Sequence, residues 1–334
     1  NFPFCTIEPN VGEVSVPDPR LEKLAAIGKS VNILPARMSF VDIAGLVKGA
    51  SQGEGLGNQF LANIRETDAI AYVLRCFEDS NVIHVSNKVD PLADAEVVET
   101  ELMLADLESL EKRRPNLEKK AKGNDKEAKQ TLELVDRALA VLREGKSARF
   151  VQRDPEEEKA FTDLQLLTSK PVLYVCNVDE ASAATGNEHS RKVEDYAAAN
   201  HAGVVIISAE IESQLAQLPD DEQAEYLDSL GLDQPGLNRL IRAAYDLLNL
   251  QTYFTVGPKE TRAWTIHRGD KAPQAAGVIH TDFERGFIRA QTIGYEDFVT
   301  LGGEVAAKEA GKARDEGKDY VVKDGDVMLF KFNV

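Results

Sequence analysis

FVDIAGLVKGASQGEGLGNQFLANIRETDAI, residues 40–70, is the stretch that decides the fold of this chain. An apolar run from Met38 to Ile43 predicts a buried parallel strand, which carries Asp42 and Gly45 to its end. A glycine-rich loop and an amphipathic helix follow. In nucleotide hydrolases this arrangement brings a carboxylate to the Mg²⁺ shell and a glycine amide to the terminal phosphate. Such a stretch alone is common in α/β proteins, so its meaning depends on the rest of the chain.

Two further apolar runs end in polar residues of the same kind. The residues NVDE (177–180) follow the run 171–176, and SAE (208–210) follow the run 204–207. Strand, polar tip and helix therefore recur three times, in the order that a doubly wound parallel sheet requires, with every tip on the carboxyl edge. We expect this edge to hold the phosphate, base and ribose ends of a nucleotide.

Composition limits the kinds of protein that this chain can be. Its 334 residues suffice for two or three domains, and a net charge of −17 argues against nucleic-acid binding over the whole surface, although it leaves room for a local basic site. Cys5, Cys76 and Cys176 are few and widely spaced, as is typical of thiols in a reducing compartment. No apolar run is long enough to span a membrane. We therefore expect a cytoplasmic protein with neither a membrane nor a DNA partner.

The pattern of the chain changes three times. Residues 1–94 read as the first part of an α/β nucleotide-binding domain, and residues 168–249 as its second part. Between them, residues 95–167 carry leucines at helical spacing, with interruptions at Pro115 and at residues 123–125. This predicts an inserted antiparallel helical domain that resembles a short coiled coil.

Residues 250–334 read as a small β-rich domain. Its short alternating segments are separated by Gly and Asp turns. The strands that they predict are Thr252–Val256, Arg262–Thr265, Ala276–Ile279, Phe287–Thr292, Tyr320–Val322 and Val327–Phe332.

Together these segments resemble the YchF subfamily of the Obg-related P-loop NTPases. The matching stretches are NFPFCTIEPN (1–10), PDPRL (17–21), 42–70, 177–180, 235–255, HTDFERGFIRA (280–290) and DGDVMLFKFNV (324–334). The resemblance implies a doubly wound P-loop NTPase sheet, an inserted helical domain and a C-terminal β-grasp TGS domain. It also implies a ribosome-associated nucleotide-switch ATPase that slowly hydrolyses ATP with Mg²⁺ and regulates translation.

One departure from the family concerns its phosphate loop. The sequence contains no G-x-x-x-x-G-K-[ST], which the family places just upstream of NFPFCT. We expect the natural chain to be longer by roughly 30 residues, the size of a strand, loop and helix unit. The lysine and backbone amides that cradle the phosphates then lie outside the sequence, so the fragment on its own is expected to be inactive.

The resemblance assigns roles to three residues around the phosphates. Thr6 would ligate Mg²⁺ through its hydroxyl, whereas without the family context it reads as an ordinary loop threonine. Asp42 would bind a water on the metal, because Mg²⁺ keeps its waters. Gly45 would offer its amide to the γ-phosphate.

Hydrolysis is expected to be slow. Leu46 stands where many small GTPases carry the glutamine that orients the attacking water, and a leucine cannot hydrogen-bond a water. His84 is the candidate to orient that water, since a neutral imidazole accepts a proton near pH 7. The alternative is a loop histidine that packs against Val82 and Val85.

The motif that reads the base departs from that of GTPases, and the resemblance to the family implies a preference for ATP over GTP. GTPases use N-K-x-D, whose aspartate accepts hydrogen bonds from guanine, whereas this chain has Val178 at the second position and Glu180 at the fourth. A carboxylate displaced by one methylene spoils the bidentate contact with guanine. The residues expected to bind nucleotide are Gly45, Asn177, Val178, Glu180, Ser208, Ala209 and Glu210.

A basic cluster interrupts the acidic background at the expected tip of the helical pair. Residues 111–129 hold eight Lys or Arg and four acidic residues. The cluster is either a solvated helix surface or a contact with ribosomal RNA of the large or small subunit, through Arg113, Arg114, Lys119 and Lys120.

Two other functions remain open from the sequence. The first is a switch GTPase that prefers GTP. The second is a non-catalytic RNA- or ribosome-binding adaptor with a vestigial nucleotide site, a reading that Leu46 and the missing phosphate loop support.

Overall fold

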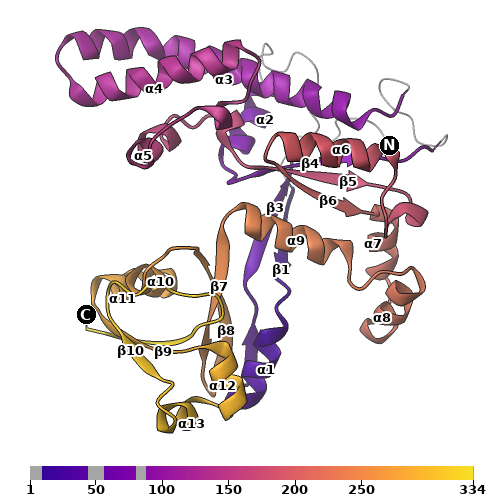
Figure 1. Ribbon diagram of the computed structural model, residues 1–334, viewed down its shortest axis with the longest axis vertical. Coiled ribbons are helices and arrows are strands. Elements are labelled where there is room, and N and C mark those ends of the chain that lie inside the picture. The colour runs from indigo at the N-terminus through magenta and orange to yellow at the C-terminus, as the bar shows by residue number, and fades with distance from the viewer. Residues whose placement is uncertain (1–9, 44–55, 80–87, 334) are drawn as a thin grey trace. The chain divides into compact units, whose positions relative to one another are not determined.

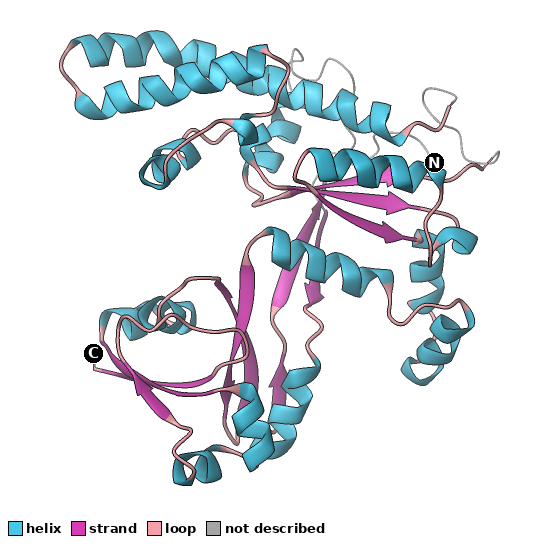
Figure 2. Cartoon of the chain, viewed as in Figure 1, coloured by secondary structure: helices cyan, strands magenta, loops and turns pink. Residues whose placement is uncertain are grey.

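The computed structural model describes residues 10–43, 56–79 and 88–333. Its contacts divide the chain into two compact units, the first comprising residues 1–11 and 41–237 and the second comprising residues 12–40 and 238–334. Helices and strands are labelled in Figure 1 and coloured by type in Figure 2.

In the residues that the structure describes, three parallel strands form the sheet of the first unit. They are β4 (Ile70–Arg75), β5 (Val172–Asn177) and β6 (Gly203–Ile207), labelled in Figure 1 and hydrogen-bonded in the order β4-β5-β6. Residues 172–176 are all buried, because β5 is the central strand and both of its faces are covered. The predicted strands at 69–77, 171–176 and 204–207 are thus confirmed to within a few residues. The strand predicted at 38–43 is β3 (Arg37–Asp42), which pairs with β1 (Asn10–Ser15) and not with this sheet in the described part of the chain. The prediction that this strand is buried is wrong, because its residues are half-buried or exposed in a two-stranded pairing.

Helices complete the first unit, and α6 covers one face of its sheet. Its helices outside the arm are α2 (Leu56–Arg65), α5 (Glu158–Thr162), α6 (Glu188–Ala199), α7 (Ala209–Leu215) and α8 (Asp220–Ser229). Val193 and Ala197 of α6 pack against Tyr174 and Cys176 of β5. Cys76 and Cys176 are fully buried free thiols, as the sequence predicts, while Cys5 lies outside the described residues.

The inserted residues form a helical arm, the antiparallel pair of α3 (Pro91–Lys122) and α4 (Lys126–Arg143) (Figure 1). Each helix begins at an aspartate whose side chain accepts a backbone N–H, Asp90 for α3 and Asp125 for α4. The interruption at 123–125 is the turn between the helices. The interruption predicted at Pro115 is wrong, since α3 continues through this residue. Packing of α3 on α4 outweighs the hydrogen bond that the proline removes.

The chain returns from the arm through short helical turns at residues 148–150, 155–157 and 167–169. Asp106 of α3 holds this return segment. Its buried carboxylate accepts hydrogen bonds from the Leu167 and Thr168 amides at 2.8 Å each and from Thr168 Oγ1 at 2.7 Å. Burial raises the pKa of Asp106, an effect that these hydrogen bonds oppose.

The second unit contains a six-stranded mixed sheet in the order β10-β9-β11-β7-β8-β2. The strands are β2 (Asn32–Leu34), β7 (Leu250–Val256), β8 (Glu260–His267), β9 (Phe287–Ile293), β10 (Arg314–Glu316) and β11 (Val327–Phe332). The helices are α9 (Gly236–Leu247, which begins in the first unit), α10 (Ala272–Ile279), α11 (Thr281–Arg285), α12 (Tyr295–Leu301) and α13 (Glu304–Glu309).

Four of the six predicted strands in this unit are confirmed, and two predictions are wrong. Residues 276–279 belong to α10, and residues 320–322 contribute only an isolated bridge between Val321 and Lys271. A short apolar run does not distinguish a strand from a buried helix, and Ala275 and Ala276 are buried on the helix.

Residues 12–40 are built into the second unit, although they precede the predicted end of the first part of the nucleotide-binding domain at residue 94. They include most of β1 and β3 together with α1 (Pro19–Gly28) and β2, which pairs in parallel with β8. Leu21 and Leu24 of α1 lie in the same buried cluster as Phe254 of β7.

In the described part of the chain, no helix combines the length and the apolar character needed to cross a membrane.

Candidate functional site

The ends of β5 and β6 bring two of the predicted motifs together. Asn177 is the last residue of β5, and its Oδ1 accepts a hydrogen bond from the backbone N–H of Ala209 at 2.9 Å. The Val178 amide donates to the Ile207 carbonyl at 2.8 Å. These bonds fix the tip of β5 to the start of α7, because parallel strands end at the same edge of a sheet.

Ser208 lies at this junction with an unsatisfied hydroxyl. The residue is almost fully buried, yet its Oγ has no hydrogen-bond partner in the part of the chain that the structure describes. Buried polar atoms are nearly always paired with protein, water or ligand. The hydroxyl is therefore a group that a bound molecule or a water would satisfy.

Glu180 is held by a residue that the sequence analysis missed. Gln214 of α7 donates from Nε2 to Glu180 Oε1 at 2.9 Å and to Glu210 Oε1 at 3.1 Å. The Tyr226 hydroxyl of α8 donates in turn to Gln214 Oε1. Burial, together with the negative charges of Glu180 and Glu210, raises the pKa of Tyr226, so the phenol keeps the proton that it donates. The four-residue spacing of Glu210 and Gln214 was the one signal in the sequence, since such residues share a helix face.

The remaining residue of the NVDE motif has a local structural role. Asp179 precedes a short helical turn (Glu180–Ser182) and accepts hydrogen bonds from the Ser182 amide at 3.0 Å and the Ser182 hydroxyl at 3.1 Å. Its carboxylate caps the turn that follows β5 and thereby sets the direction in which Glu180 leaves the strand.

Asn187 connects the neighbouring strand to the same edge, and the sequence analysis also missed it. Its Nδ2 donates to the Cys76 carbonyl, just past β4, at 2.6 Å, while its Oδ1 accepts from the Ser190 amide at 3.0 Å. The first turn of α6 is thus fixed to the end of β4.

Of the residues predicted near the phosphates, only Asp42 lies within the described part of the chain. It is the last residue of β3, and its side chain is exposed. An exposed carboxylate has the oxygen-ligand chemistry that Mg²⁺ and its waters require. Thr6, Gly45, Leu46 and His84 lie outside the described residues. Among the described residues, no three His, Cys, Asp or Glu side chains are grouped to hold a metal ion.

The basic cluster on the arm divides into paired and unpaired cations. Lys112 pairs with Glu108 at 2.6 Å, Lys122 pairs with Glu118 at 2.9 Å, and Arg114 pairs with Asp136 at 2.7 Å. The Arg113 guanidinium donates to the Leu164 carbonyl at 2.8 Å.

The other four cations of the cluster are exposed lysines beside the turn between α3 and α4. Within the described structure none of them forms an ion pair with a carboxylate. They are Lys119, Lys120, Lys126 and Lys129. Of the four residues predicted to contact RNA, Lys119 and Lys120 are therefore unpaired in the described structure, whereas Arg113 bonds to the return segment and Arg114 pairs within the arm.

Comparisons with known proteins cover the whole chain. A family model for the YchF GTPase C-terminal region, described as a protein of unknown function, matches residues 250–333. A second family model, described as a 50S ribosome-binding GTPase, matches residues 1–103. The ribosome-binding ATPase YchF of Escherichia coli O157:H7 is 58% identical over 334 residues, covering 100% of this chain and 92% of that protein. Its namesake from Bacillus subtilis is 52% identical over 336 residues with the same coverage.

A solved structure has the same fold. The Schizosaccharomyces pombe YchF GTPase matches with a TM-score of 0.85 and 36% sequence identity, over 99% of this chain and 90% of that chain.

Proposed function

The chain belongs to the YchF family, and we propose that it is a cytoplasmic, ribosome-associated ATPase that binds ATP with Mg²⁺ and hydrolyses it slowly. The observation that carries this proposal is the junction of β5 and α7, where Asn177 bonds to Ala209 and Glu180 stands in place of the guanine-reading aspartate. Curated relatives that carry the name ribosome-binding ATPase extend over the full chain.

Adenine is the preferred base because the Glu180 carboxylate is engaged by Gln214. The hydrogen bond from Gln214 Nε2 to Glu180 Oε1 at 2.9 Å draws the carboxylate toward α7 and competes with a bidentate contact to the two guanine N–H groups. The 6-amino group of adenine needs a single acceptor, which Asn177 or a nearby carbonyl supplies.

The test is a titration of the full-length protein with ATP and with GTP in the presence of Mg²⁺. We expect tighter binding of ATP, and a clear preference for GTP would overturn the proposal. Gln214→Ala should release Glu180 and move the ratio of affinities toward GTP. Gln217→Ala is the matched control, because among the described residues the side chain of this glutamine donates to the Ser213 carbonyl and not to Glu180, so the ratio should be unchanged.

The phosphate-binding loop that the family resemblance implies is proposed to lie beside β4. Within the part of the chain that the structure describes, β4 is hydrogen-bonded to β5 alone, and Val73 of β4 is 69% exposed. A parallel strand that pairs with this free edge would place the loop after it at the carboxyl edge.

Magnesium would be held near the end of β3. Asp42 offers a carboxylate there, and the metal would neutralise charge on the terminal phosphates during hydrolysis. Thr6 is proposed as the direct ligand and Gly45 as the γ-phosphate contact on the basis of the family resemblance. His84 is proposed to orient the water on the same basis.

Ribosomal RNA is the proposed partner of the arm. The lysines that contact it are those left unpaired, Lys119, Lys120, Lys126 and Lys129. They lie within about two helical turns of the tip of a two-helix arm, so they can approach a phosphate backbone while the acidic remainder of the chain stays away.

A further inference from the structure

The side chain of Gln214 joins α7 to α8 and to the end of the NVDE motif. Its Nε2 donates to Glu180 Oε1 at 2.9 Å and to Glu210 Oε1 at 3.1 Å, and its Oε1 accepts from the Tyr226 hydroxyl of α8. A glutamine amide has two N–H groups to donate and one oxygen to accept. Both N–H groups and the oxygen of Gln214 are therefore engaged.

The partners of Gln214 favour one orientation of its amide. Two carboxylates, which only accept hydrogen bonds when they are ionised, face Nε2, and a phenol faces Oε1. Burial and the nearby charges of Glu180 and Glu210 raise the pKa of Tyr226, so its hydroxyl remains a donor. A reversed amide would place its oxygen against the two carboxylates and would lose both of the hydrogen bonds to them.

The packing of α8 on α7 sets the position of Tyr226. Leu227 of α8 is buried in the same cluster as Ile211 and Leu215 of α7, and Tyr226 packs against this cluster. Burial of these side chains away from water holds the two helices together. The hydrophobic contact between the helices thus holds the phenol, and the phenol holds Gln214.

The orientation of Glu180 depends on this hold, because its side chain is exposed. An exposed glutamate side chain samples several rotamers, and fixing it costs conformational entropy. The hydrogen bond from Gln214 keeps the carboxylate turned toward α7, and this bond persists only as long as Gln214 stays in place. A loosened Gln214 gives Glu180 more access to orientations that accept both guanine N–H groups, so the preference for ATP should fall.

We propose that Tyr226 is a positioning residue for base selection, which holds Gln214 against Glu180 and thereby strengthens the preference for ATP over GTP. Its effect on the base is indirect, because it acts through Gln214. The inference rests on the proposed function, since it needs a nucleotide base to bind where β5 meets α7. It goes further by giving α8 a part in specificity, although this helix carries none of the motifs assigned to nucleotide binding.

Titration of the full-length protein with ATP and with GTP in the presence of Mg²⁺ tests this role. Tyr226→Phe keeps the ring that packs against the cluster and removes only the hydroxyl. We expect the ratio of ATP to GTP affinity to fall about threefold, the size of one neutral hydrogen bond. Gln214→Ala should lower the ratio further, because it removes the contact with Glu180 itself.

A double variant separates positioning from a merely structural role. Because the phenol acts through Gln214, Tyr226→Phe should leave the ratio unchanged in a protein that already carries Gln214→Ala. A tyrosine that only stabilises the fold would weaken ATP and GTP binding equally, so its loss would change the ratio in neither background.

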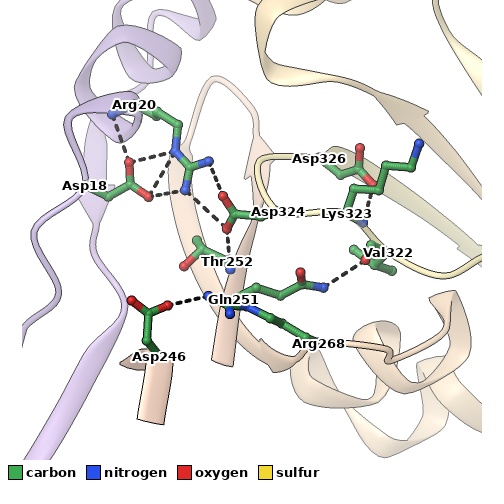
Figure 3. A network of polar contacts seen from close by, with 10 residues as sticks. All are labelled: Asp18, Arg20, Asp246, Gln251, Thr252, Arg268, Val322, Lys323, Asp324 and Asp326. Atoms are coloured by element: carbon green, nitrogen blue, oxygen red, sulfur yellow. Dashed lines mark hydrogen bonds and ion pairs between the residues drawn. The ribbon is translucent and has the colours of Figure 1, made fainter. Parts of the chain in front are cut away.

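Tyr320→Phe is the matched control. The Tyr320 hydroxyl donates to the Asp326 carboxylate at 2.7 Å, and the same carboxylate accepts from the Lys323 amide (Figure 3). This variant also removes a phenol hydroxyl from a hydrogen bond, but Tyr320 belongs to the second unit. It should keep the wild-type ratio, and thermal unfolding of both variants shows that each has folded.

The outcomes separate this inference from the proposed function. A wild-type ratio in Tyr226→Phe, or the same change in the ratio with and without Gln214, would overturn the positioning role while leaving the ATPase intact. An unchanged ratio in Gln214→Ala would overturn it as well, because the phenol would then have nothing to act through. A wild-type protein that prefers GTP, or that binds neither nucleotide, would overturn the proposed function itself.

Discussion

Reversing the charge of the unpaired lysines at the tip of the arm should weaken ribosome binding and reduce the dependence of this binding on salt concentration. The perturbation is the quadruple variant of Lys119, Lys120, Lys126 and Lys129 to Glu. These side chains are exposed and make no ion pair in the described structure, so no contact within the arm is lost. The paired cations of the same cluster are left unchanged.

The expected magnitude follows from the number of phosphates that the four lysines neutralise. Each lysine–phosphate contact contributes about 0.7 to 0.9 to the slope of log affinity against log salt, so four contacts contribute about 3. Over the fourfold range from about 50 to about 200 mM salt, such a slope lowers the affinity by about 60-fold. The variant should lose this part of the salt dependence and bind more weakly at low salt.

The assay is co-sedimentation of the protein with ribosomes at a series of salt concentrations. A charge-matched control reverses four exposed lysines elsewhere, Lys23, Lys159, Lys259 and Lys318, and thereby changes the net charge equally. The control should keep the wild-type slope, and both variants should bind ATP normally. Equal slopes for wild type and arm variant would refute the reasoning and make the lysines a solvated helix tip.

Three more predictions concern the base, the chemistry and the stability of the arm. Combining Glu180→Asp with Val178→Lys should shift the ratio of ATP to GTP affinity toward GTP by about tenfold or more, the size expected for gaining one polar contact with the base. Titrations of the variant with ATP and with GTP measure this ratio, and an unchanged ratio would count against the assignment of the motif. His84→Ala should slow ATP hydrolysis and leave ATP affinity nearly unchanged, because its role is confined to the transition state; a parental rate with and without ribosomes would leave the histidine no part in the reaction. Asp106→Ala leaves three buried hydrogen-bond donors of residues 167–168 without an acceptor, so urea denaturation should show a loss of about 3 kcal/mol in the free energy of unfolding. A loss below about 1 kcal/mol would contradict this account.

The sequence was sufficient for the strands β4, β5 and β6 of the first unit and for the helical pairing of the arm, but not for the place of β3. A central parallel strand is covered on both faces, so β5 must read as a continuous apolar run, and residues 171–176 do. The arm must repeat its leucines at helical spacing, and Leu110, Leu139 and Leu142 lie in its core. These signals are local, because the spacing of apolar residues within each strand or helix reflects which of its faces are buried.

Local signals failed where a short apolar segment could be buried equally well in a strand or in a helix. Residues 276–279 read as a strand but lie in α10, which starts where the Lys271 amide donates to Gln274 Oε1 at 2.8 Å. Pro115 read as a helix stop, yet contacts with α4 maintain α3 on both sides of it. In both cases tertiary packing outweighed the preference of a few residues.

The sequence by itself determined which residues are chemically able to form the site, since Asp42, Asn177 and Glu180 are recognisable from their motifs. Only the tertiary structure decided what holds them. Asn177 is bonded to Ala209, 32 residues away, and Glu180 is engaged by Gln214, 34 residues away. The physical reason is that hydrophobic periodicity specifies which face of an element is buried, whereas the partner that covers this face is fixed only when the whole chain packs.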